Sequence, residues 1–199
     1  MTPREDAMPS TREEVRAVLT ALLNDQSDDV RRAAAEGLER LESLEAIEHI
    51  KETLEKGEKG QQLRAVYALG TLRDERAMAA VVSALTSPEV DIRAAAVRAM
   101  ASWDERAIDS LLEALKDPSL DVRVLALEAL EKFRDRRLVE VMLSLLEGQE
   151  DELRGKAIEA LGRLGAIRAK DPLLKLLQDP NPSIRQKAAR AVSELELPS

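Results

Sequence analysis

Hydrophobic and polar positions repeat along this chain in a constant frame. The frame is an anchor, usually Arg, followed by Ala at three, a small residue at six, an apolar residue at seven and a large apolar residue at ten positions after it. The anchors are Arg31, Gln62, Arg93, Arg123, Arg154 and Arg185, which lie 31, 31, 30, 31 and 31 positions apart. Self-similarity at a fixed period is typical of proteins built from stacked structural repeats.

Each repeat predicts two helices, which we name the A helix and the B helix. Apolar residues stand twelve and eight positions before every anchor, and an i, i+4 pair of this kind marks one face of a helix, the A helix. The frame after the anchor predicts the B helix in the same way. The expected repeats cover residues 11–42, 43–73, 74–103, 104–134, 135–165 and 166–195. We therefore expect one repeat domain over 11–195, between a flexible tail at 1–10 and a second tail at 196–199.

The frame resembles the HEAT-like repeat family, in particular the short-repeat branch of phycobilisome lyase accessory proteins and of bacterial and archaeal scaffolds. Family members pair an Asp in the loop between the A and B helices with the Arg six positions later, which forms a ladder along the stack. The ladder positions here are Asp25 and Arg31, Asp117 and Arg123, Asp179 and Arg185, with Arg93 and Arg154 preceded by Ser87 and Gly148 instead of an acid. The second repeat has neither member and carries Lys56 and Gln62.

This resemblance implies an all-α protein, a right-handed α-α superhelix or α-solenoid of six HEAT-like helix pairs. Each pair buries its apolar stripes against its neighbours and is not stable alone. The A helices would form the outer layer and the B helices the inner, concave layer. By the same resemblance, the exposed inner positions lie just before the anchor and one, two, five and nine positions after it.

These inner positions define a candidate binding groove with an apolar centre in the second to fourth repeats. Its residues are Leu63, Arg64, Tyr67, Val90, Ala94, Arg98, Leu120, Val124, Leu125, Glu128, Lys132 and Lys156. An apolar patch with a polar rim is typical of a protein interface. If the assigned facing is off by one position, Val124 or Leu125 belongs to the core instead.

The inner positions also carry more basic than acidic residues, although the formal net charge of the chain is −8. One interpretation is electrostatic attraction of an acidic partner surface. The other is a solvated face of mixed charge, because acidic residues at the start of the B helices lie along one edge of this strip.

Composition excludes several kinds of chemistry. The chain has no Cys and a single His, His49, which rules out disulfides, zinc–thiolate sites, iron–sulfur clusters and any site that needs two imidazoles. No pattern singles out a catalytic carboxylate pair, so we expect no enzymatic activity, no cofactor and no metal. No apolar run approaches ~18 residues and residues 1–10 do not resemble a signal peptide, so we expect a cytoplasmic protein without a membrane partner.

We therefore expect a non-enzymatic protein–protein interaction scaffold that binds a protein or peptide in the concave groove. The resemblance leaves a second function open, that of a bilin lyase subunit or chromophore-handling chaperone of the phycobilisome lyase type. Nucleic-acid backbone binding is a weaker alternative, since the chain is acidic and two of its three aromatic residues, Trp103 and Phe133, occupy core positions of the frame. The last B helix has no clear capping repeat, which leaves self-association through the C-terminal end open.

Overall fold

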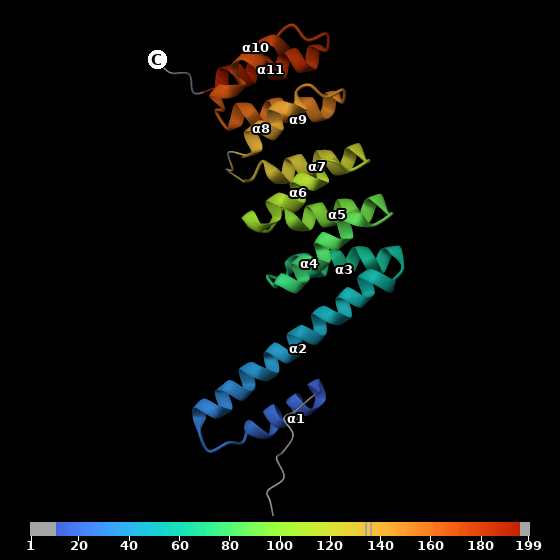
Figure 1. The fold of residues 1–199 in the computed structure, drawn as a ribbon, viewed down its shortest axis with the longest axis vertical. Coiled ribbons are helices and arrows are strands. Elements are labelled where there is room, and N and C mark those ends of the chain that lie inside the picture. The colour runs from blue at the N-terminus through green and yellow to red at the C-terminus, as the bar shows by residue number, and fades with distance from the viewer. Residues whose placement is uncertain (1–10, 134, 136, 196–199) are drawn as a thin grey trace, which may run out of the picture.

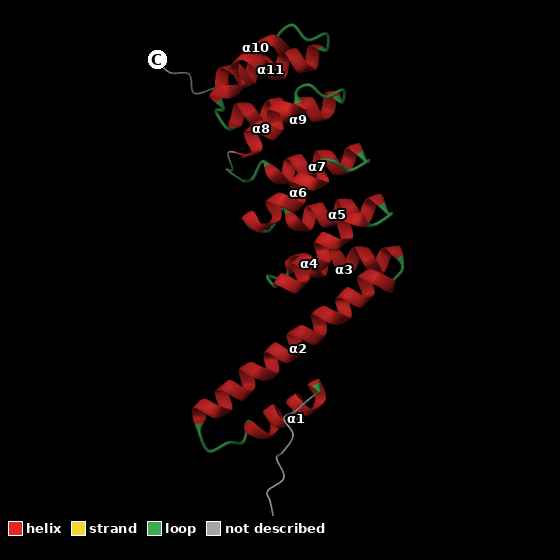
Figure 2. Cartoon of the chain, viewed as in Figure 1, coloured by secondary structure: helices red, strands yellow, loops and turns green. Residues whose placement is uncertain are grey.

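The computed structural model describes residues 11–133, 135 and 137–195, and all regular structure within them is helical (Figure 1, Figure 2). The tails expected at 1–10 and 196–199 lie outside the described residues. The α-helices are α1 (Arg12–Leu22), α2 (Asp28–Lys56), α3 (Lys59–Thr71), α4 (Glu75–Ser83), α5 (Val90–Met100), α6 (Ile108–Ala114), α7 (Leu120–Leu130), α8 (Arg137–Leu145), α9 (Asp151–Arg163), α10 (Lys170–Leu176) and α11 (Pro182–Glu194). Three short 3-10 helices adjoin α4, α6 and α10: η1 (Ala84–Thr86), η2 (Glu105–Ala107) and η3 (Ile167–Ala169).

The helices stack into an α-solenoid, which confirms the predicted fold class. The B helices α3, α5, α7, α9 and α11 each pack against the next. The A helices α4, α6, α8 and α10 each pack against the B helix that follows them. Figure 1 shows the resulting column, with α1 at one end and α10 and α11 at the other.

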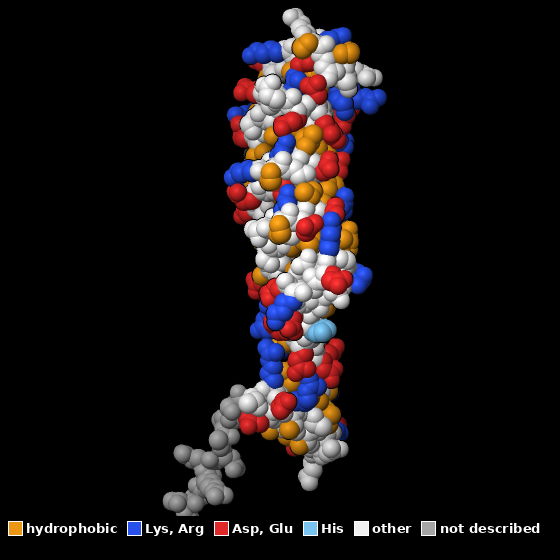
Figure 3. Space-filling view, turned by 90° about the vertical axis from the view of Figure 1, so that its right-hand side faces the viewer, with side chains coloured by type: hydrophobic (Ala, Val, Ile, Leu, Met, Phe, Trp, Pro, Cys, Tyr) orange, Lys and Arg blue, Asp and Glu red, His pale blue; other side chains and the backbone are white. Residues whose placement is uncertain are grey.

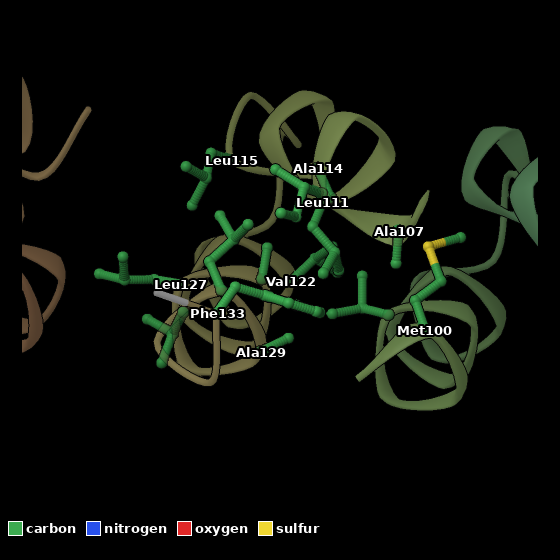
Figure 4. Packing of buried hydrophobic residues seen from close by; sticks show 14 of the residues in the cluster. Met100, Ala107, Leu111, Ala114, Leu115, Val122, Leu127, Ala129 and Phe133 are labelled. Atoms are coloured by element: carbon green, nitrogen blue, oxygen red, sulfur yellow. The ribbon is translucent and has the colours of Figure 1, made fainter. Parts of the chain in front are cut away.

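The repeat frame also accounts for the core. The side chains seven positions after the four middle anchors, Leu69, Met100, Leu130 and Leu161, are 0% exposed. The first and last repeats have Leu38 and Val192 at this position, and both are half-buried because an end repeat has a neighbour on one side only. In the fourth repeat, Leu111 and Ala114 of α6 point toward Val122 of α7 (Figure 4). Full burial of one such large side chain contributes about 1.5–3 kcal/mol.

The long helix α2 differs from the expected arrangement. A turn near residues 42 and 43 is expected between the first B helix and the second A helix, but this expectation is wrong, because α2 is one helix of 29 residues. Figure 1 shows α1 beside the first half of α2 and α3 beside its last turns. Arg16 of α1 holds the middle of α2 through Glu45, at 2.5 Å, and Glu42, at 3.6 Å.

Local sequence explains why this turn is missing. Before α4 and α6, Asp74 and Asp104 accept hydrogen bonds from main-chain N–H groups of the following turn, and such caps start a new helix. After α9, Gly165 has a φ of 59°, a left-handed conformation that ends a helix. The first repeat has Ser43 at the corresponding position, surrounded by Glu, Leu and Ala, which favour continuation of the helix.

We expect the variant Ser43→Pro to destabilise α2. Proline inside a helix removes one hydrogen bond and clashes with the preceding turn, at a cost of about 3 kcal/mol. Glu75→Pro is the matched control, because Glu75 is the first residue of α4, where proline is well accepted. Thermal unfolding followed by circular dichroism compares the two variants, and equal stability would contradict a continuous α2.

Candidate functional site

The anchor arginines hold the loops that lead into the B helices. Arg123 donates from Nη1 to the main-chain oxygen of Asp117, six positions earlier, at 2.7 Å. The same bond joins Arg31 to Asp25, Arg93 to Ser87, and Arg185 to Asp179. Because the acceptor is a main-chain oxygen, Ser87 replaces the acid without loss of this bond.

The side chains of the ladder pair between consecutive repeats. Arg93 donates from Nε and Nη2 to both carboxylate oxygens of Asp117 in the next repeat, at 2.7 and 3.0 Å. Arg154 binds Asp179 of the next repeat in the same sense. Arg123 reaches Glu150 at 2.6 Å. The resemblance predicts a pair within one repeat, six positions apart, whereas the structure joins these arginines to the following repeat.

The second repeat fits this pairing between neighbours. Gln62 donates from Nε2 to the main-chain oxygen of Leu54 at 2.8 Å, and the loop of the next repeat carries Ser87. A neutral anchor is thus followed by a neutral loop residue, whereas the charged Arg93 is followed by Asp117. This combination avoids a buried charge without a partner, which would be costly.

The predicted groove residues lie at different depths on α3, α5, α7 and α9. Tyr67 is 50% exposed and Val90 is 40% exposed. Of the others, Arg64, Arg98 and Lys132 are exposed, and Leu63, Leu120, Leu125, Glu128 and Lys156 are half-buried. Ala94 and Val124 are only 7% and 8% exposed, so they belong largely to the packed layer and offer little contact surface.

Five of the predicted residues line one cavity, which we name cavity I. It has a volume of 310 Å³ and lies between α5, α7 and the start of α9. The predicted residues are Val90, Ala94, Arg98, Val124 and Leu125. Asp91, Asp121 and Glu152 also line it. Cavity I is therefore an apolar depression bordered by one guanidinium and three carboxylates.

A second cavity, which we name cavity II, adjoins the first. It has a volume of 380 Å³ and lies between α3 and α5. Arg98 lines both cavities. The other residues of cavity II are Tyr67, Gly70, Thr71, Arg73, Ala99, Ser102 and Trp103. A Cβ on Gly70 would lie 2.6 Å from the Cβ of Ala99, so glycine is needed for the close approach of α3 and α5.

Trp103 and Arg73 are site residues that the repeat frame does not reveal. The frame assigns Trp103 to the core between repeats, and its Nε1 does donate to the main-chain oxygen of Gly70 across the repeat boundary, at 3.0 Å. The side chain is nevertheless only half-buried and forms a wall of cavity II. Arg73 lies in the turn after α3, outside the helix positions that the frame compares.

Ion pairs across consecutive B helices neutralise much of the positive charge in the last three repeats. The pairs are Lys156 with Glu128, Lys187 with Glu159, and Arg163 with Glu131. The hydrogen bond that Lys156 donates to Glu128 raises the pKa of Lys156. Within the described chain, Arg73 and Arg98 of cavity II form no ion pair. Figure 3 shows side chains of both signs along one side of the column, with hydrophobic side chains between them.

Comparison with protein families decides what this repeat is. Models of HEAT repeats match residues 15–43 and, in overlapping segments, residues 51–123, 78–161 and 108–193. The chain belongs to the HEAT repeat family. The match is to HEAT repeats in general, and membership of the phycobilisome lyase branch stays a prediction. No curated protein sequence matches the chain.

Solved structures with a similar fold include engineered repeat proteins. An engineered protein of 22% identity has a TM-score of 0.51, over 91% of this chain and 96% of that protein. A designed armadillo repeat protein in complex with the peptide (KR)4 has 17% identity and a TM-score of 0.53, over 91% and 99%. A computationally designed armadillo repeat protein for modular peptide recognition has 17% identity and a TM-score of 0.52, over 89% and 98%. At these identities the likeness shows the fold alone.

The described HEAT repeats offer neither a cluster of metal ligands nor a membrane-spanning helix. In the described part of the chain, no three acidic or imidazole side chains are grouped so that they could hold a metal ion. No described helix combines the length and the apolar character that crossing a bilayer requires. HEAT and armadillo folds are commonly protein-binding scaffolds.

Glu131 is the most poorly satisfied carboxyl group of this HEAT array. Its Oε2 accepts a bond from Arg163, but its Oε1 is buried without a hydrogen-bond partner among the described residues. Burial raises the pKa of this carboxyl group. It stands at the repeat position that Gly70 and Gly162 occupy elsewhere, where the space between B helices is small.

The pair of Arg93 and Asp117 is a nearly buried ion pair between two HEAT repeats. The two side chains are only 9% and 7% exposed. Burial alone would raise the pKa of Asp117, but hydrogen bonds from Arg93 and from the main-chain N–H of Ser119 outweigh it and lower that pKa. The ionised pair is therefore the stable form in the folded protein.

We expect Asp117→Ser to lower the free energy of unfolding by about 3 kcal/mol, because it leaves the buried Arg93 without its carboxylate. The double variant Arg93→Gln, Asp117→Ser recreates the Gln62 and Ser87 combination and should recover at least half of the loss. Urea unfolding measures both. Asp121→Ser is the control, since Asp121 is exposed. A double variant as unstable as the sum of its single variants would contradict direct coupling.

The same pair predicts how stability changes with pH. A carboxyl group whose pKa is lowered in the folded state stabilises the fold above its ordinary value of 3.8, and this contribution is lost as the pH falls through the lowered value. The stability difference between the wild type and Asp117→Asn should therefore be full at about pH 6 and shrink below about pH 4. Urea unfolding at several pH values checks this, and a difference that is constant with pH would be inconsistent with it.

Proposed function

We propose that this HEAT repeat protein is a non-enzymatic scaffold that binds a protein or peptide on the surface formed by cavities I and II, which we name the groove. The observation that carries the proposal is the position of the exposed apolar side chains. Five large ones lie at the two ends of the column: Val18, Leu23, Ile167, Leu174 and Leu177. Only Tyr67 and Val90 are exposed to this degree in the middle of the described column.

End repeats expose apolar side chains because they have one neighbour, but Tyr67 and Val90 have neighbouring repeats on both sides. Their exposure is thus not a consequence of missing packing partners. Tyr67 lines cavity II and Val90 lines cavity I. Exposed apolar side chains in adjoining depressions with charged borders are typical of a protein-binding surface.

Close packing of the B helices supports a location on the concave side. Besides Gly70 and Ala99, α9 and α11 also approach closely, since a Cβ on Gly162 would lie 2.8 Å from the Cα of Ala191. In a curved stack, the layer with the smaller spacing between helices lies on the inside of the curve. The designed armadillo protein solved with the peptide (KR)4 has a similar fold, which supports a peptide or protein as the class of partner.

We expect the double variant Val90→Glu, Leu125→Glu to lose its partner while it keeps its helical content and melting temperature. Val124 is not suitable for this test, because a glutamate at a nearly buried position would unfold the layer. Affinity capture from the source organism, quantified by mass spectrometry, should show at least about tenfold lower recovery of the specific partner, as expected for a central contact.

Val18→Glu is the matched control, because Val18 is an equally exposed apolar residue at the end of the column. It should recover the partner as the wild type does. Equal recovery by the groove variant, with its fold intact, would contradict binding at cavities I and II.

A further inference from the structure

We propose that cavity II receives an acidic side chain of the partner, and that an apolar residue beside it occupies cavity I. The partner segment would therefore be a peptide that carries Asp or Glu next to an aliphatic or aromatic residue. This inference rests on the proposed function and adds the chemistry of the ligand.

The hydrogen-bonding groups of cavity II select an acceptor. The hydroxyl groups of Thr71 and Ser102 already donate to the main-chain oxygens of Ala68 and Ala99, both at 2.7 Å. The donors that remain are the guanidinium groups of Arg73 and Arg98 and the hydroxyl of Tyr67, none of which makes a hydrogen bond or an ion pair within the described chain. A guanidinium only donates and fits a carboxylate with two parallel bonds.

The nearest acids of the chain are already engaged. Asp91 binds Lys59 at 2.5 Å. Asp104 accepts bonds from the side chain of Arg106, both at 2.9 Å, and the side-chain and main-chain bonds from Arg106 lower its pKa to about 2. No acidic residue lines cavity II itself. The two arginines thus have no direct ion pair in the described chain: Arg98 acts on Asp91, and Arg73 on Asp104, only through longer-range attraction that helps to lower the pKa of each carboxyl group. By contrast, Lys156, Arg163 and Lys187 form direct ion pairs with glutamates of the preceding repeat.

The walls of cavity II are suited to a defined side chain. The indole of Trp103 is held by its bond to Gly70, and Tyr67 lines the same cavity as Arg73 and Arg98. Aromatic rings and guanidinium planes give a carboxylate-bearing chain apolar contact along its methylenes and hydrogen bonds at its end. Cavity II therefore offers apolar contact to the methylene groups of a Glu or Asp side chain and hydrogen bonds to its carboxylate.

Cavity I sets the order of residues in the partner. Its apolar surface comes from Val90 and Leu125, and its far border carries Asp121 and Glu152, which form no ion pair in the described chain. A second acidic residue there would be repelled. The acid is consequently restricted to the side of Arg73 and Arg98, and the apolar residue to the other side.

A nucleic-acid phosphate is the competing anion. Backbone binding requires a track of cations along many phosphates, but on this surface the arginines of cavity II are followed directly by the carboxylates of cavity I. A single carboxylate beside an apolar residue fits this alternation better than a chain of phosphates. A duplex DNA and a single-stranded RNA therefore serve as arms of the test.

The experiment is a selection of displayed random peptides against the full chain, followed by affinity measurement with the enriched peptides by fluorescence anisotropy. We expect peptides with Asp or Glu next to an apolar residue. The double variant Arg73→Glu, Arg98→Glu should weaken their binding at least about tenfold, and added salt should weaken wild-type binding. Arg76→Glu, on the exposed surface of α4, is the control and should bind within about twofold of the wild type.

Different results would overturn different parts. Loss of binding of the selected peptides to Val90→Glu, Leu125→Glu would support groove binding. If these peptides are basic, or if they bind Arg73→Glu, Arg98→Glu as they bind the wild type, the acidic ligand is overturned and groove binding is left intact. Absence of any peptide sensitive to the Val90 and Leu125 changes would overturn both. The duplex DNA or the RNA could also bind more tightly than any peptide. If the Arg73→Glu, Arg98→Glu variant loses this binding, cavity II is assigned to phosphate instead.

Discussion

The rest of this structure depends on the two contacts that a single anchor arginine makes. Arg93 binds the main-chain oxygen of its own loop at Ser87 and the carboxylate of Asp117 in the next repeat. Because one rigid guanidinium makes both contacts, the loop before one B helix is held in register with the loop before the next. The mutual position of α5 and α7, which line cavity I, follows from this register.

Within that register, small residues decide where the B helices touch and where the surface remains open. Gly70 lets α3 and α5 come together at Ala99, and Trp103 reaches back to the main chain of Gly70. The larger side chains at the border, Tyr67 and Arg98, cannot enter this contact and stand around cavity II. Close packing of the B helices in one layer thus leaves cavity II open between these larger side chains.

Charge is distributed by the same geometry. In the last two repeats, a lysine two positions after the anchor meets a glutamate of the preceding B helix, as Lys156 meets Glu128 and Lys187 meets Glu159. The second and third repeats lack this combination, and Arg73 and Arg98 form no direct ion pair in the described chain, although each attracts a more distant carboxylate. Part of the positive charge is therefore neutralised in the last two repeats, whereas Arg73 and Arg98 stay exposed at cavity II.

The repeat frame predicted much of the fold, because it reports which positions are buried in every repeat. It placed Leu69 and Leu130 at core positions, where both are 0% exposed, and it placed Tyr67 and Val90 at exposed inner positions, where they are 50% and 40% exposed. It did not predict that α2 is continuous, because a repeat period only counts positions and contains no information on helix capping. The first repeat has Ser43 at the position where Asp74 and Asp104 start new helices in later repeats. The local capping chemistry was readable in the sequence and carried this information.

By itself, then, the sequence determined the helical repeat class, the residues of the core and the chemistry that the chain lacks. Only the tertiary structure decided that Asp117 pairs with Arg93 of the preceding repeat, that Val124 is nearly buried, and that Trp103 forms a wall of cavity II. Each of these depends on the distance between side chains one repeat apart. That distance is set by how closely two helices pack, and a pattern along one dimension does not contain it.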